Sequence, residues 1–268
     1  MLIRAKAPLR LSFGGGGTDV APFPAAEGGS VLSATINRYA YGSLRTRDDD
    51  TIKIRSLDFG VTVSYSRDDK VAYDGKLDLV KAAIAHVGIP QQGFDLFLHT
   101  EAPPGSGLGS SSALMVALVA LLNDWHRLNL TEYQVADLAV RLEREELGIP
   151  GGLQDQYAAV FGGFNFIEFL ADRVIVNPLR VSPTVQNELQ YNLLLAFTGK
   201  SRISDRIIED QVGRYVEKQG SSVDALRRLK AISVEMKNCI VGGELEHFGP
   251  LLHRSEEHTS ELQSLAYL

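Results

Sequence analysis

A glycine- and serine-rich loop is the clearest candidate for chemistry in this sequence. It reads Gly105-Ser-Gly-Leu-Gly-Ser-Ser-Ser112 and runs directly into an apolar stretch, Ser111 to Trp125, with helical periodicity. Glycine lets the backbone turn sharply and approach a ligand closely. The unpaired N–H groups at a helix start favour an anion such as a triphosphate. The loop is therefore predicted to hold phosphate, and a plain glycine turn with a serine N-cap is the alternative.

Two familiar nucleotide-binding patterns do not fit. Thr198-Gly-Lys-Ser201 ends like a Walker A loop, but Leu194 stands where that loop requires glycine. The alternate spacing of Gly105, Gly107 and Gly109 also differs from G-x-G-x-x-G. The sequence therefore indicates a phosphate-binding loop of another kind.

A second candidate is the strand-like stretch from Ala7 to Asp19, which ends in four glycines and a Thr-Asp pair. Consecutive glycines lose much conformational entropy in an ordered fold, so the close approach of a ligand is a reasonable compensation. Asp19 would then accept hydrogen bonds from sugar hydroxyls. A flexible hairpin tip is the alternative interpretation.

A third candidate runs from Glu143 to Asp155 and combines a helix end, a glycine-rich turn and an acid near the next helix start. Phosphoryl transfer to a hydroxyl needs metal to neutralise phosphate charge and a group that orients the acceptor. Glu143 could hold magnesium, and Asp155 could receive the hydroxyl proton. The alternatives are a solvated helix face, Glu143 with Glu145 and Glu146, and a helix cap at Asp155.

The elements that must position these residues fall into two patterns. Short β-type stretches are predicted over 2–5, 31–44, 51–55, 61–65 and 94–99, with a helix over 77–87. Helices are predicted over 111–125, 132–147, 204–217 and 223–241, a strand hairpin over 165–170 and 173–176, and an apolar strand over 191–197. The helix over 111–125 is apolar almost all round, which predicts that it lies in the core.

Composition narrows the class of protein. Of 268 residues, 44% are hydrophobic and 22% charged, as in globular proteins, and the net charge of −6 argues against a nucleic-acid or anionic-membrane partner. Cys239 is the only cysteine, so no intrachain disulfide can form, and a cytoplasmic setting is expected. The chain start does not read as a secretory signal, and the longest apolar run, 113–122, falls short of the roughly 20 residues of a membrane helix. The sequence does not indicate which oligomeric state the protein adopts.

The three candidate regions together resemble the GHMP kinases, which include galactokinases, homoserine kinases and mevalonate kinases, over roughly residues 1 to 250. Pro104 to Ala113 is similar to that family's P-x-x-x-G-L-G-S-S-x-A signature. The resemblance implies an ATP- and Mg²⁺-dependent kinase of α+β class, with catalytic Asp155, Arg10 near the transferred phosphate, and magnesium on Glu143 and Ser111, for which Ser110 is a rival. The residues implied to contact ATP are Pro104, Gly105, Ser106, Gly107, Leu108, Gly109, Ser110, Ser111 and Ser112.

Within the family, four segments look most like the heptose 7-phosphate kinases: Phe13 to Asp19, Gln154 to Tyr157, Phe161 to Phe166 and Thr198 to Arg202. This resemblance implies a small-molecule sugar phosphate as substrate, phosphorylated at its anomeric hydroxyl. The residues implied to bind it are Gly14, Gly15, Gly16, Gly17, Thr18, Asp19, Gln156, Thr198, Lys200 and Arg202. Ordinary surface placement of Lys200 and Arg202, a kinase for another sugar such as fucose, and a non-catalytic sugar sensor are alternatives.

The predicted domains are an N-terminal ribosomal-protein-S5-like domain over 1–180 and a ferredoxin-like C-terminal domain over 181–253, with the active site in the cleft between them. No second glycine-rich segment of the kind that completes the family's smaller domain follows residue 241. We therefore expect the C-terminal domain to be truncated, and an inactive fragment is a further alternative. Residues 254–268 resemble translated sequencing adapter and are expected to be non-native, with an ordinary amphipathic helix end as the alternative.

Overall fold

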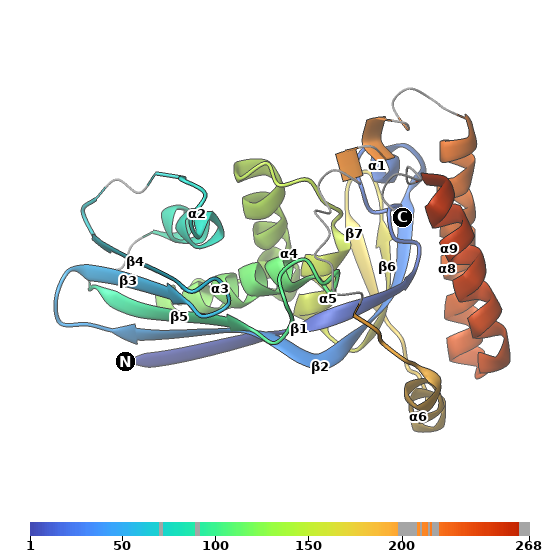
Figure 1. Cartoon of the computed structure of the whole chain (residues 1–268), viewed down its shortest axis with the longest axis horizontal. Coiled ribbons are helices and arrows are strands. Elements are labelled where there is room, and N and C mark those ends of the chain that lie inside the picture. The colour runs from blue at the N-terminus through green and yellow to red at the C-terminus, as the bar shows by residue number, and fades with distance from the viewer. Residues whose placement is uncertain are drawn as a thin grey trace. The chain divides into compact units, whose positions relative to one another are not determined.

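The computed structural model describes residues 1–69, 72–88, 92–197, 208–209, 211–213, 215 and 220–262. The chain divides into two compact units (Figure 1). Unit 1 comprises residues 1–9 and 36–149, and unit 2 comprises residues 10–35 and 150–268. Two long strands, β1 (Leu2–Gly14) and β2 (Gly29–Thr46), contribute residues to both units. The division by sequence near residue 180 stays a prediction.

Unit 1 contains a twisted sheet in the strand order β4-β3-β5-β2, with β1 pairing with β2. The further strands are β3 (Thr51–Ser56), β4 (Val61–Ser66) and β5 (Phe94–Thr100). β3 runs parallel to β5, with Ile54 opposite Leu96, and β2 runs antiparallel to β5, with Leu44 opposite the same Leu96. These three side chains are almost fully buried, because alternate residues of a strand point to one face.

Helices pack against that buried face of the unit 1 sheet. They are α2 (Asp78–Val87), α3 (Ser110–His126), α4 (Glu132–Val140) and a π-helical turn, Arg141–Glu146, that continues α4. α3 contacts α2, α4 and β5, and its middle section is buried on all sides. The predicted core position of this helix is therefore confirmed. Thr131 starts α4 with a capping box, in which its hydroxyl accepts from the backbone of Gln134.

Unit 2 builds a second core around the first part of β2. That part pairs with β6 (Phe164–Phe169), which pairs with β7 (Val174–Pro178), so the predicted hairpin is confirmed. The unit's helices are α1 (Phe23–Glu27), α5 (Gln154–Phe161), α6 (Pro183–Asn192), α8 (Gly220–Gly242), the short 3₁₀ turn Leu245–His247, and α9 (Phe248–Leu262). α5 contacts β6 and β7, while α8 and α9 lie side by side (Figure 1). The Phe13 ring meets Phe248 edge-on at 5.4 Å between centroids.

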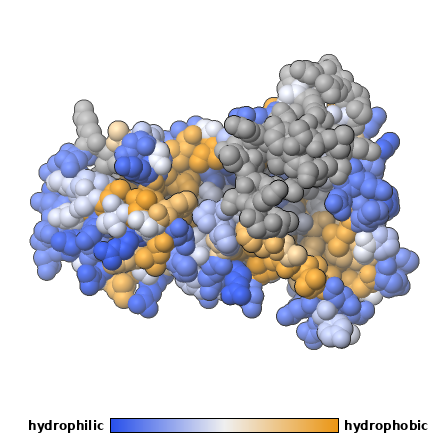
Figure 2. Space-filling view, in the orientation of Figure 1, coloured by the Kyte–Doolittle hydropathy of each residue, from blue (hydrophilic) through white to orange (hydrophobic). Residues whose placement is uncertain are grey.

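The predicted strand over 191–197 is wrong. Tyr191 and Asn192 end α6, and 193–197 form no regular structure. Tyr191 and Leu194 are each 90% exposed, and hydrophobic surface lies next to α6 in Figure 2. Strand-forming residues are stabilised by neighbours across the sheet, and no strand in the described part of the chain pairs with this segment.

The remaining helix predictions have mixed outcomes. The helix predicted over 223–241 lies within α8, and the one over 132–147 is α4 extended by the π-helical turn. Most of the helix predicted over 204–217 lies outside the described residues. Residues 254–262 continue α9, and their non-native origin stays a prediction. Across the residues that could be described, no helix combines the length and apolar character that a bilayer crossing requires.

Candidate active site

The glycines of the predicted phosphate loop are required by the backbone conformation. Gly105, Gly107 and Gly109 have φ angles of 74°, 77° and 71°, in the left-handed region where other residues are strained. Gly109 is the N-cap residue of α3, so the predicted alternative of a serine N-cap is wrong. Glycine has no side chain to cap the helix, and no other side chain caps it. This geometry suits an anion.

Glu143 lies beside this loop within unit 1. Its Oε1 and Oε2 accept hydrogen bonds from the Ser111 and Ser112 hydroxyls, each at 2.8 Å. Glu143 is 1% exposed, whereas Glu145 and Glu146 are exposed. The interpretation of Glu143 as part of a solvated helix face is therefore wrong. A buried carboxylate is expected to need such partners, because burial without hydrogen bonds is strongly unfavourable.

The donor set around Glu143 suits a hard cation. Mg²⁺ prefers oxygen ligands and commonly combines one or two carboxylates with phosphate oxygens and water. Ser111 and Glu143 offer a hydroxyl and a carboxylate at hydrogen-bond distance from each other. Within the described ranges, no three His, Cys, Asp or Glu side chains form a metal-binding group. A site completed by nucleotide phosphates would not need such a group.

In unit 2, Arg10 and Asp155 form an ion pair. Arg10 lies on β1, and Asp155 lies in the first turn of α5. Arg10 Nε donates to Asp155 Oδ1 at 2.7 Å, and the two side chains are 12% and 19% exposed. The N-cap residue of α5 is Leu153, so Asp155 is not the helix cap.

The four glycines at the end of β1, of which Gly14 is the last strand residue, lead into an ordered turn, so the flexible-tip interpretation is wrong. Gly15 has a φ of 85°, and a Cβ there would lie 1.9 Å from the Ser30 carbonyl oxygen. Thr18 Oγ1 donates to the Gly15 carbonyl at 2.7 Å and accepts from the Ser30 N–H at 3.0 Å. The turn is therefore fixed against the start of β2, and Thr18 is fully buried.

Asp19 is also fully buried. Its carboxylate is bonded to Gln154, which lies in the third candidate region of the sequence, Glu143 to Asp155. Its Oδ1 accepts from the Gly17 N–H at 3.1 Å and from Gln154 Nε2 at 3.3 Å, and its Oδ2 accepts from the Gln154 N–H at 3.0 Å. Burial raises the pKa of Asp19 above its ordinary value, and the nearby charge of Asp155 adds to this. The sequence did not single out Gln154 as a partner of Asp19.

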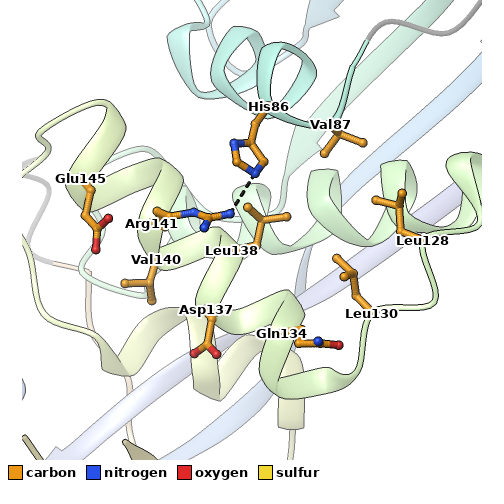
Figure 3. A pocket seen from close by; sticks show the side chains of 10 residues that line it. All are labelled: His86, Val87, Leu128, Leu130, Gln134, Asp137, Leu138, Val140, Arg141 and Glu145. Atoms are coloured by element: carbon orange, nitrogen blue, oxygen red, sulfur yellow. Dashed lines mark hydrogen bonds between the residues drawn. The ribbon is translucent and has the colours of Figure 1, made fainter. Parts of the chain in front are cut away.

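Four further residues were predicted to bind the sugar phosphate. Gln156 is fully buried in α5, and Thr198, Lys200 and Arg202 lie outside the described residues. A cavity of about 610 Å³ in unit 1 is lined by residues from α2, α4 and the turn before α4 (Figure 3). His86 accepts a 2.8 Å hydrogen bond from Arg141 there. None of the lining residues belongs to the predicted site.

Comparisons with known proteins identify similar sugar kinases. Residues 78–163 match the GHMP kinases N terminal domain. The chain is 38% identical to D-glycero-alpha-D-manno-heptose 7-phosphate kinase of Campylobacter jejuni over 94% of its length and 76% of that protein. A solved heptose 1-phosphate kinase from Bacteroides thetaiotaomicron superposes with a TM-score of 0.85 and 33% identity, over 97% of this chain and 80% of the other. An Arabidopsis thaliana bifunctional fucokinase/GDP-fucose pyrophosphorylase is 27% identical, over 97% of this chain and 26% of that longer protein.

The chain belongs to the GHMP kinase family. The predictions of this family, of its mixed helix and sheet fold and of a phosphotransferase that uses ATP are confirmed.

Proposed function

We propose that this protein transfers the γ-phosphoryl group of ATP to the anomeric hydroxyl of D-glycero-D-manno-heptose 7-phosphate, giving the 1,7-bisphosphate. The observation that carries the proposal is the pairing of Ser111 and Ser112 with buried Glu143 at the uncapped start of α3. This arrangement places anion-binding N–H groups beside a carboxylate, as a nucleotide with its metal requires. The similarity to a heptose 7-phosphate kinase supports the choice of sugar.

Magnesium is the proposed metal, with Ser111 and Glu143 as its protein ligands. Bound there with the ATP phosphates, it would neutralise charge on the transferred group. The Ser111 hydroxyl now donates to Glu143 Oε1, so metal binding would replace this hydrogen bond. A carboxylate buried beside the loop favours binding of a cation there over a second anion.

The proposed role of Asp155 is to orient the acceptor hydroxyl. Its Oδ1 accepts a hydrogen bond from Arg10 Nε at 2.7 Å. An ion-paired carboxylate can still accept a hydrogen bond from the acceptor hydroxyl and so hold it in place. Orientation and charge neutralisation are therefore the proposed source of the rate enhancement, with full deprotonation a smaller part.

The sugar phosphate is proposed to bind along the ordered turn from Gly14 to Thr18 and against Gln156, while Asp19, at the end of this turn, is buried. Thr198, Lys200 and Arg202 are proposed to hold its phosphate, since guanidinium groups bind phosphate through paired hydrogen bonds. A cytoplasmic setting, and the absence of nucleic-acid and membrane partners, are proposed from the acidic composition and the lone cysteine.

A kinase assay against heptose 7-phosphate, heptose 1-phosphate, fucose and galactose tests the proposal. We expect fastest turnover with heptose 7-phosphate and a product carrying a new anomeric phosphate, identified by phosphorus NMR. The similarity to a fucokinase makes fucose the second candidate, and preferred turnover of fucose would replace the first. Sugar binding without turnover of any substrate would support the sensor alternative.

A further inference from the structure

We infer that Asp19 is a positioning residue for Asp155, and that it acts by holding the first turn of α5 rather than by touching the sugar. This inference rests on the proposed role of Asp155 in acceptor orientation. It concerns two carboxylates separated by more than a hundred residues of sequence, both of which belong to unit 2.

Asp19 supplies the cap that α5 otherwise lacks. The N-cap residue of this helix is Leu153, whose side chain cannot accept a hydrogen bond. The Gln154 N–H donates instead to Asp19 Oδ2 at 3.0 Å, and the Gln154 side chain donates to Oδ1 at 3.3 Å. Since Gln154 immediately precedes Asp155, these bonds fix the backbone from which the Asp155 side chain extends.

Asp19 is itself held rigidly. Its Oδ1 accepts a third bond, from the Gly17 N–H at 3.1 Å, and the preceding residue, Thr18, is bonded to the start of β2. On the other side, a Cβ at Gly152 would lie 2.0 Å from Asp19 Oδ2, so only glycine allows this approach. The carboxylate therefore transmits the position of the glycine turn to the start of α5.

Burial argues against direct sugar contact by Asp19. The residue is 0% exposed, and amide donors already engage both carboxylate oxygens. By contrast, the Asp155 side chain retains 19% exposure. A sugar hydroxyl can thus approach Asp155 without rearrangement, whereas reaching Asp19 would require displacing its amide partners. Misplacing a reacting group by about 1 Å can slow a reaction about a hundredfold. Loss of the hydrogen bonds from Gln154 to Asp19 is therefore expected to lower kcat.

The test is a double-mutant cycle with Asp19→Asn and Asp155→Asn in the full chain, assayed with ATP and heptose 7-phosphate. In Asp19→Asn, one carbonyl oxygen and one NH₂ group replace the two acceptor oxygens, so one of the N–H donors loses its acceptor. We expect kcat to fall about tenfold or more while KM for the sugar changes less than about threefold. In the Asp155→Asn background, the same change should cause no further loss, because residues that act as a unit are non-additive.

Amide hydrogen exchange gives a readout that is independent of turnover. The Gln154 and Asp155 amides should exchange faster in Asp19→Asn than in the wild-type chain. Gly152→Ala, which crowds Asp19 Oδ2 without changing any charge, should reproduce the loss of kcat and carries the test if Asp19→Asn fails to fold. Asp58→Asn is the matched control: Asp58 also accepts a backbone N–H, from Thr100 at 2.8 Å, but it lies in unit 1, and kcat should stay unchanged.

Additive losses in the cycle, a raised KM with unchanged kcat, or unchanged amide exchange would each overturn the positioning role. A raised KM would favour direct sugar contact by Asp19. Full turnover in Asp155→Asn alone would contradict the proposed function of Asp155 and the positioning role together. Loss in Asp155→Asn with additive loss in Asp19→Asn would contradict only the positioning role.

Discussion

Ser111 Oγ donates a 2.8 Å hydrogen bond to Glu143 Oε1. The hydroxyl belongs to the first turn of α3, and the carboxylate lies in the π-helical turn that follows α4. This contact joins the predicted phosphate loop to a buried carboxylate of the same unit.

Replacing Glu143 should weaken the use of magnesium. Glu143→Gln keeps an oxygen acceptor for the serine hydroxyls but removes the charge that attracts the cation. We expect kcat/KM for ATP to fall at least about tenfold and the magnesium concentration needed for half-maximal rate to rise, since metal carries much of the charge neutralisation. Titrating magnesium in steady-state assays measures both. The neighbouring exposed Glu145→Gln should behave like the wild type, and an equal loss there would refute a specific role for Glu143.

Replacing Gly107 should weaken ATP binding. With φ at 77° and no atom within 4 Å of an added Cβ, Gly107→Val strains the backbone without a steric clash. A residue other than glycine in this conformation is destabilised by about 1–2 kcal/mol, so the loop should shift away from its binding conformation. Calorimetry with ATP should show at least about tenfold weaker binding. Gly60→Val, at a glycine with similar φ in a surface turn, is the control and should leave ATP affinity unchanged.

Removing the charge of Asp155 should slow turnover without unfolding the protein. Asp155→Asn cannot form the ion pair with Arg10 and offers the acceptor hydroxyl a weaker partner. We expect kcat to fall at least about tenfold, with KM for ATP nearly unchanged, measured by initial rates. Asp172→Asn, at an exposed hairpin turn of the same unit, should not alter kcat. Unchanged turnover in Asp155→Asn would reject the catalytic assignment.

The buried Asp19 should leave a signature in the pH dependence of stability. Its pKa is raised in the folded state, chiefly by burial, so the folded chain binds this proton more tightly than the unfolded chain. Stability then falls as pH rises from the ordinary carboxyl pKa through the raised folded value. Comparing denaturant unfolding of the wild type and Asp19→Asn between pH 4 and 7 should show this decline in the wild type only. Parallel curves for the two proteins would contradict it.

The residues of the candidate site could be selected from the sequence, but their contacts could not. The loop over Gly105–Ser112, Glu143 and Asp155 could be selected because their residue types and order follow from phosphate transfer. Nothing local in the sequence indicates that Asp19 bonds to Gln154, since that contact depends on the tertiary fold. Gly152 is the sequence feature that could have suggested this contact, because it is a second glycine after Pro150 and a turn does not require two. In the structure, Gly152 leaves room for the Asp19 carboxylate.

The strand predicted over 191–197 failed for a related reason. The apolar composition of this segment favours a strand only where a partner strand is present, and composition does not specify whether one is. α3 was predicted correctly because its partners surround it on every side, so that its apolar pattern alone indicates burial.

The π-helical turn over Arg141–Glu146 sets the rotational phase of the residues that follow α4. In it the Leu147 N–H bonds to the Leu142 carbonyl five residues back, at 3.2 Å, so the turn accommodates one residue more than an α-helix would. One residue corresponds to about 100° of rotation about the helix axis. Deleting a single residue within α4 would therefore rotate the Glu143 carboxylate away from both serines, even with every side chain of the site retained. The length of α4 thus constrains the site together with the identities of its residues.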